Sequence, residues 1–252
     1  MEKRVKVKFG RVVPSLALLA VIALLAGLSF IPALRSAPTA AGGAVELDTD
    51  AVRVLNTCRA YASDHAFSTR ISGAVKAKVL GIPYTQHIDG SREVCGDEFC
   101  EVAESASSFV KAAVRKECAH GDYAVCRGDY EKKSFVYGEP RAMSRDEYVD
   151  AYGMPNTGIV KYNLDGAIVG ATCVSENEFR FVLDATAATE YSRNEVRTTL
   201  GASDYPNYES VEFTLYTDGN RAIKIVAQEA FSIKKFGGTR CTAEYTEVFD
   251  YD

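Results

Sequence analysis

The feature that most constrains this chain is an apolar run of 23 residues without a charge, residues 12–34. Because an α-helix rises about 1.5 Å per residue, such a run can cross a hydrocarbon core of about 30 Å. Five basic residues precede it within residues 1–11, against one acidic residue, Glu2. Basic flanks stay in the cytoplasm. The sequence therefore predicts a single-pass protein of the cell membrane, with a cytoplasmic segment 1–11, a transmembrane helix 12–34 and the rest of the chain outside.

A cleaved signal peptide is the alternative for the same segment. Signal peptides usually have an apolar core of about 7–15 residues followed by a small-residue cleavage site. Here the core is longer, and small-residue sites occur only within residues 37–43. The first cysteine is Cys58, so the segment lacks the cysteine that a lipoprotein signal needs. We therefore favour an uncleaved signal-anchor, which makes the lipid bilayer the first expected partner.

The remaining chain divides into a linker, residues 35–43, and an extracytoplasmic domain, residues 44–252. Small and uncharged residues with Pro and Gly, as in residues 36–43, are typical of linkers. The whole chain has 29 basic and 34 acidic residues, of which six basic and one acidic lie within residues 1–35. The domain outside therefore has a net charge of −10. Such an acidic domain gives no electrostatic support for nucleic acid as a partner.

The first part of the domain predicts a helix followed by short strands. Apolar residues recur at helical spacing from Ala51 to Ala62, and after them the period changes to two. Residues 101–118 are also compatible with a helix, but the turn spacing favours strands. We expect strands at residues 67–80, 84–88, 93–102, 109–117 and 124–127, with turns at residues 89–90, 96–97 and 120–122.

The second part predicts two more helices and further strands. Ser144 and Glu147 form a capping-box pattern, which predicts a helix over residues 145–152. A second helix is expected over residues 189–200. The expected strands are residues 158–164, 167–175, 178–184, an alternating hairpin around residues 211–227, and residues 231–236 and 240–251. The fold class is α+β, with a large curved antiparallel sheet, resembling half a barrel, and two to three helices packed on one side.

Four of the seven cysteines have spacings that suggest geometry. If short hairpin loops follow Cys95 and Cys118, then Cys95 faces Cys100 and Cys118 faces Cys126, and both pairs are possible disulfides. Unpaired, buried thiols explain the same residues equally well. A zinc site that adds His120 to these four fits less well, because no C-x-x-C spacing is present. We therefore assign no metal site, and the odd total leaves at least one free thiol.

No sequence motif supports catalysis. The chain has no nucleophile elbow, P-loop, dinucleotide-binding glycine pattern or zinc-protease pattern. Cys118 and His120 lack a third orienting group, and we interpret Glu101 and Glu104 as residues of a solvated surface. We therefore expect no enzyme activity, no catalytic residues and no cofactor.

Two runs in the C-terminal half carry a resemblance to other proteins. Residues 203–211 (SDYPNYESV) and 236–242 (FGGTRCT) follow a leading helix, a Tyr- and Phe-rich meander and a capped helix. This pattern, over residues 143–251, resembles uncharacterised membrane-anchored surface proteins of Gram-positive gut bacteria. The resemblance implies no known activity.

The order of elements also resembles the lipoprotein-carrier half-barrels of the LolA and LppX type. That resemblance implies a curved sheet that encloses an apolar cavity, with helices at its mouth. This chain differs in keeping its anchor and in lacking a lipid-attachment cysteine. The expected function is to bind an apolar or amphipathic ligand on the concave face of the sheet. The alternative is a structural or protein-interaction module of the cell envelope, with an envelope protein as partner and no ligand.

Overall fold

The computed structural model of the chain describes residues 47–79, 82–107, 111–152, 157–159, 167–200, 205–234 and 238–252. The predicted transmembrane helix, residues 12–34, and the linker lie outside this range. Within the range, no helix combines the length and the apolarity that a membrane crossing requires.

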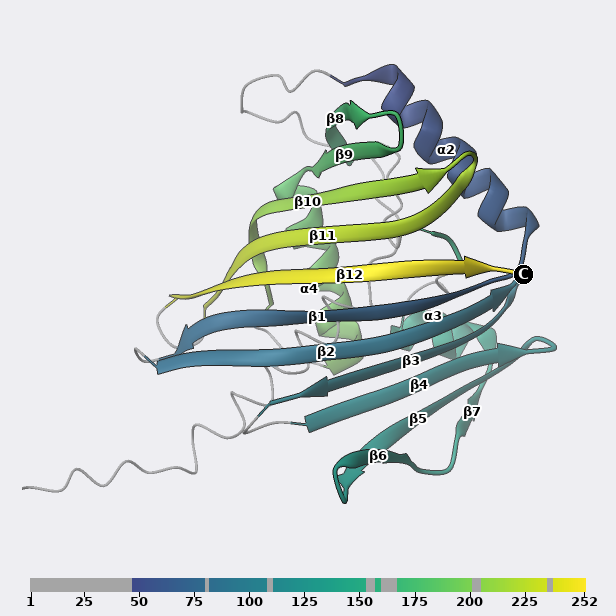
Figure 1. The fold of residues 1–252 in the computed structure, drawn as a ribbon. Helices are drawn as coiled ribbons and strands as arrows, with labels where there is room; N and C mark the ends of the chain where they lie inside the picture. Colours follow the sequence, from purple (N-terminus) through teal and green to yellow (C-terminus); the bar gives the residue numbers. More distant parts are fainter. Residues whose placement is uncertain are drawn as a thin grey trace, which may run out of the picture.

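The described residues form three helices and one twelve-stranded antiparallel sheet (Figure 1). In chain order the elements are α2 (Thr49–Asp64), β1 (Phe67–Val79), β2 (Ile82–Cys95), β3 (Glu98–Ala106), β4 (Lys111–Ala119), β5 (Asp122–Glu131), β6 (Ser134–Tyr137), β7 (Arg141–Met143), α3 (Arg145–Tyr152), β8 (Ile168–Ser175), β9 (Glu178–Leu183), α4 (Ala185–Leu200), β10 (Asn207–Asp218), β11 (Arg221–Ile233) and β12 (Thr239–Tyr251). Across the sheet the order is β6-β5-β4-β3-β2-β1-β12-β11-β10-β9-β8, and β7 pairs with β5.

The first and last strands of the domain meet at the middle of the sheet. β1 and β12 pair from Phe67 with Tyr251 to Ala77 with Cys241. From β1 the strands follow one another outward to β6, and from β8 they follow one another inward to β12. The chain therefore builds one half of the sheet, passes through α3 to the far edge, and returns to close the centre.

All three helices contact the same face of the sheet, which we call the covered face; the other is the open face. The predicted apolar stripe of α2 is buried, and its Tyr61 ring lies 5.3 Å from the ring of Tyr251. Helix α3 packs Tyr148 against Phe99. Helix α4 packs along β10, where the backbone N–H of Tyr208 donates to Thr189 Oγ1 at 2.8 Å. Figure 1 shows α3 and α4 behind the curved sheet.

The predicted capping box at the start of α3 is confirmed. The backbone N–H of Ser144 donates to Glu147 Oε2 at 2.8 Å, and the backbone N–H of Glu147 donates to Ser144 Oγ at 3.2 Å. These two bonds satisfy donors that a helix start leaves without partners. The hydrogen bonds from Ser144 also hold the pKa of Glu147 below its ordinary value.

The α+β class, the curved antiparallel sheet and the helices on one side are confirmed for the described residues. Several boundaries were wrong. The expected turn at residues 89–90 lies inside β2, where Gly90 pairs with both Ile71 and Ala103. Of the expected strand 231–236, residues 231–233 are the end of β11. β6 and β7 were not expected, and of the strand 158–164 only Gly158 and Ile159 are described, outside any strand.

Candidate functional site

Two adjacent rows of side chains cross the covered face, and both are buried. Residues two apart on a strand point to the same face, so each row includes one residue per strand. The apolar row consists of Phe67, Val94, Phe99, Cys118 and Tyr123, which lie opposite one another on β1 to β5. The polar row, two positions further along each strand, consists of Thr69, Arg92, Glu101 and Lys116 on β1 to β4.

Helix α3 covers the outer part of the apolar row. The ring of Tyr148 lies 4.9 Å from that of Tyr123, 5.9 Å from that of Phe99 and 5.4 Å from that of Tyr152. Burial, together with the nearby carboxylate of Glu101, raises the pKa of Tyr148 above its ordinary range. The Tyr148 hydroxyl is therefore neutral.

Arg92 is the most buried charged residue of the polar row, with 1% of its surface exposed. Its Nε donates to Glu247 Oε1 at 3.0 Å, and its Nη2 donates to the same oxygen. Its Nη1 donates to the carbonyl oxygen of Gly158 at 2.9 Å. This guanidinium therefore joins β2, β12 and the segment that follows α3.

Lys116 lies at the other end of the polar row. It is 6% exposed, and its cross-strand neighbours are Glu101 on β3 and Val125 on β5. Its ammonium lies 5.4 Å from the centre of the Tyr152 ring, a cation–π contact. Within the described part of the chain it makes no ion pair or hydrogen bond through its side chain.

A second polar group on the covered face forms a hydrogen-bonded network. Gln86 Nε2 donates to Ser105 Oγ at 2.6 Å, and Ser105 Oγ donates to the carbonyl oxygen of His87 at 3.2 Å. The hydroxyl of Tyr84 hydrogen-bonds with Gln86 Oε1. Because buried polar groups that satisfy one another cost little, this network is consistent with a structural role.

The carboxylates Glu101 and Glu104 do not share a solvated surface as expected. They are three residues apart on β3, so they point to opposite faces. Glu101 is 4% exposed on the covered face, whereas Glu104 accepts a hydrogen bond from the Tyr137 hydroxyl at 3.0 Å on the open face. The helical alternative for residues 101–118 would have placed them together.

The cysteine geometry differs from the expectation. Cys95 pairs with Glu98, and Cys100 pairs with Glu93, because the β2–β3 turn contains two residues. Cys118 pairs with Tyr123, so Cys126 lies three positions away and on the opposite face. All seven cysteines are free thiols in the structure. Neither expected pair lies face to face, and a bridge between Cys118 and Cys126 would require the strands to move.

The same geometry separates the residues weighed for zinc. Cys118 lies on the covered face, while Cys100 and Cys126 lie on the open face, on either side of Arg115. Among the described residues, no group of three or more His, Cys, Asp or Glu side chains is placed to hold a metal ion. Burial raises the pKa of both open-face thiols.

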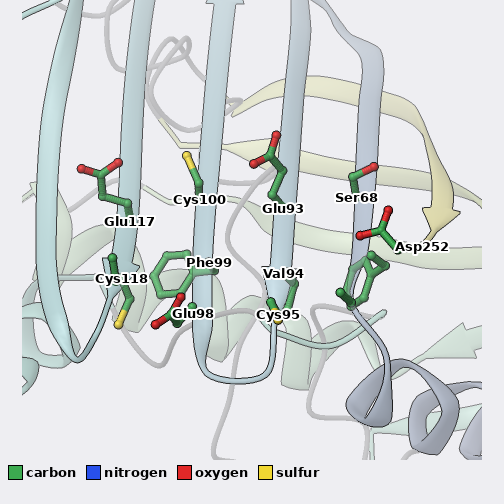
Figure 2. A pocket seen from close by; sticks show the side chains of 13 residues that line it. Ser68, Glu93, Val94, Cys95, Glu98, Phe99, Cys100, Glu117, Cys118 and Asp252 are labelled. Carbon is green, nitrogen blue, oxygen red and sulfur yellow. The ribbon is translucent and has the colours of Figure 1, made fainter.

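A groove of about 530 Å³ lies where β2 turns into β3. Figure 2 shows Glu93, Cys100 and Glu117 in line across three neighbouring strands of this groove. The C-terminal Asp252 also lines it. Glu98, at its rim, accepts a hydrogen bond from the backbone N–H of His120 at 3.0 Å. The polar lining is thus mostly carboxylate, unlike the mixed charges of the polar row.

The sequence motifs do not single out Arg92 or Lys116. If Gly90 lies inside a strand, the alternation of Ile88, Arg92 and Val94 predicts that Arg92 lies on the buried face. Lys116 follows from Cys118 by the same rule.

Comparisons with known proteins assign no family to the chain. No family model and no curated protein matches the chain. Among solved structures, the chain is similar to a DUF1329 family protein from Desulfovibrio piger, with 10% sequence identity and a TM-score of 0.32. The match covers 80% of this chain and 93% of that chain. A TM-score this low carries no argument about fold or function.

Proposed function

We propose that the chain is a membrane-anchored, extracytoplasmic binding protein, without enzyme activity, that holds an amphipathic ligand on the covered face of its sheet. The observation that carries the proposal is the adjacency of the two buried rows. The apolar row and the polar row lie two residues apart on the same strands, a distance of about 7 Å. A ligand with a hydrocarbon body and a polar end matches this arrangement. Binding sites generally combine an apolar lining with a few polar groups.

The location of the helices supports the same face. Helix α3 is short and contacts the covered face mainly through Tyr148, its one buried residue. Its axis ends at Tyr152, beside the polar row. Helix α3 is eight residues long, so a ligand that enters beside it displaces one short helix and no strand. Entry of a ligand beside α3 therefore requires no opening of the sheet.

The absence of Trp from the sequence allows a direct test. Phe99→Trp places the protein's single indole in the apolar row, and Val248→Trp places it on the open face at a position that is 44% exposed. The full-length chain, in lipid nanodiscs, is titrated with dibromostearic acid, whose bromine atoms quench a nearby indole. We expect saturable quenching with Phe99→Trp and only weak, linear quenching with Val248→Trp.

Equal quenching in both variants, or none in either, would contradict the proposal. The alternative is a structural or interaction module of the cell envelope, with a closed core and no ligand. This alternative predicts no quenching in either variant. Circular dichroism melts of both variants establish that the Trp substitutions leave the domain folded. Native mass spectrometry of the full-length protein after extraction then identifies any molecule that remains bound.

A further inference from the structure

The charges along the polar row are balanced. Arg92 forms an ion pair with Glu247 of β12, with 3.0 Å between Nε and Oε1. Lys116 has Glu101 of β3 as its direct cross-strand neighbour. Two cations and two carboxylates therefore leave no net charge for a ligand to neutralise. The groove at the β2–β3 turn is lined mostly by carboxylates, which also disfavour an anionic ligand.

The group in the polar row that lacks a hydrogen bond is the hydroxyl of Thr69. Thr69 is 3% exposed, and in the part of the chain that the structure describes its buried Oγ1 has no hydrogen-bond partner. Such a hydroxyl costs free energy, and nearly all buried polar atoms of folded proteins have a partner. An uncharged polar group that hydrogen-bonds with Thr69 would remove this cost, and it would bring no charge into a balanced row.

Thr69 lies where the polar row meets the apolar row. On β1 it is two residues from Phe67, so both side chains point to the covered face. Its cross-strand neighbours are Phe249 on β12 and Arg92 on β2. The rings of Phe67 and Phe249 have their centres 5.9 Å apart. A molecule that binds the Thr69 hydroxyl would therefore have a buried apolar surface directly beside it, which favours an attached hydrocarbon chain.

We infer that the covered face takes a neutral amphiphile, such as a fatty alcohol or an acylglycerol, whose uncharged polar end hydrogen-bonds with the Thr69 hydroxyl and whose hydrocarbon chain lies along the apolar row. The inference rests on the proposed function and adds the chemistry of the polar end to it.

The test compares three probes with the same brominated chain and different polar ends. Dibromostearyl alcohol, dibromostearic acid and dibromostearylamine are titrated against the full-length Phe99→Trp protein in nanodiscs. At about pH 9 the acid is an anion and the amine a cation, while the alcohol is neutral. The alcohol should bind at least tenfold more tightly than either charged probe, because a charged end would enter a balanced row without a partner.

Two variants and one control locate the effect in the same reporter protein. Thr69→Val removes the hydroxyl and keeps the branched shape, and it should weaken binding of the alcohol about threefold to tenfold, as expected for one neutral hydrogen bond. Thr69→Ser keeps a hydroxyl and should keep the preference for the alcohol. Thr242→Val is the matched control, because Thr242 is exposed on the open face of β12. It should change no affinity.

The protein without a probe provides a second measurement. Thr69→Val removes a buried hydroxyl that has no hydrogen bond, so it should raise the melting temperature by about 2–4 °C. If it lowers the melting temperature instead, the hydroxyl already binds the protein or a buried water, and the inference is wrong.

Other results would overturn the inference as well. If the acid or the amine binds as tightly as the alcohol, the site does not select a neutral end, while the proposed function stands. If Thr69→Val and Thr242→Val have the same effect on binding of the alcohol, Thr69 does not contact the polar end. If no probe quenches the Phe99→Trp protein, the proposed function fails too.

Discussion

Arg92 and Glu247 form a buried ion pair between strands that are 155 residues apart in the sequence. Arg92 belongs to β2 and Glu247 to β12, and both strands flank β1. The pair therefore spans the seam where the first and last strands of the described sheet, β1 and β12, meet. The same guanidinium binds the carbonyl oxygen of Gly158, so the connection after α3 is held at this seam too.

Removal of one partner of this pair should be strongly destabilising. Arg92→Met leaves the Glu247 carboxylate buried without its cation, and we expect a loss of about 3–5 kcal/mol in the free energy of unfolding. The double variant Arg92→Met, Glu247→Leu should recover most of that loss, because no uncompensated charge is left. Urea denaturation followed by circular dichroism measures both.

The control is the exposed pair of Arg180 and Glu212 on the open face. Arg180→Met should cost less than about 1 kcal/mol, as is usual for ion pairs at the surface. If the double variant were no more stable than the single variants, packing of the two side chains, and not their charges, would hold the seam.

The centre of the sheet also contains a close approach that only glycine permits. A Cβ added to Gly73 would lie 2.5 Å from the Cβ of Tyr245 and 2.4 Å from the carbonyl oxygen of Glu244. We therefore expect Gly73→Ala to cost about 1–3 kcal/mol or to shift β12. Gly138→Ala is the control, since its nearest neighbour would be 3.8 Å away. Thermal melts that show equal effects at both positions would contradict this.

The sequence predicted the parts of the fold that rest on periodic patterns. The buried stripe of α2, the capping box at Ser144 and the alternation in β10 are all local signals, and all are confirmed. The predicted strand ends were wrong where the turns consist of residues that rarely form turns. Lys132 and Lys133 turn the chain into β6 with φ of 46° and 76°, a conformation that lysine rarely adopts, so no pattern indicated a turn there.

The candidate site could be predicted less well, because it depends on register. Gly90 was interpreted as a turn, and this interpretation removed Arg92 from any strand. The turn after Cys118 was centred on Asp122, whereas the structure pairs Ala119 with Asp122. The observed register differs from the expected one by three residues, since Cys118 pairs with Tyr123 and not with Cys126, and an odd shift moves Cys126 to the opposite face. The pairing of Arg92 with Glu247 is long-range, and one sequence contains no signal for it.

The predicted membrane anchor is tested by fractionation and by fusion. The full-length protein should stay with membranes after alkaline carbonate extraction, because residues 12–34 are apolar throughout. A reporter fused after Asp252 should be active outside the cell, and one inserted after Arg11 should be cytoplasmic. A protein whose N-terminus begins within residues 38–46 would show that the segment is cleaved.

The carboxylate of Asp48 should make stability depend on pH. It caps α2 by accepting from the backbone N–H of Asp50 at 2.9 Å, and it accepts from the backbone N–H of Cys173 on β8 at 3.2 Å. Hydrogen bonds from Cys173, first of all from its thiol, and from α2 hold the pKa of Asp48 below its ordinary value. A lowered pKa stabilises the fold above the unfolded-state pKa, and this contribution is lost as the pH falls through the folded-state pKa.

Asp48→Asn should therefore lower the melting temperature by a few degrees at pH 7, and the difference should shrink as the pH falls below the ordinary value of 3.8 and through the lower pKa of the folded state. Glu147→Gln repeats the test at the start of α3, where the pKa of the carboxylate is also lowered. A difference from wild type that is constant with pH would mean that the amide cannot replace the geometry of the cap, independently of its charge.

The cysteines should behave as separate thiols. Non-reducing peptide mapping of the full-length protein should recover Cys118 and Cys126 as separately alkylated peptides, since the strand register puts them on opposite faces. Cys118→Ser should cost about 1–3 kcal/mol, because it places a hydroxyl in the apolar row. Cys95→Ser is the control; its side chain is exposed, and the change should stay within about 0.5 kcal/mol. A peptide that contains Cys118 linked to Cys126 would show that the register of β4 and β5 differs from the one described.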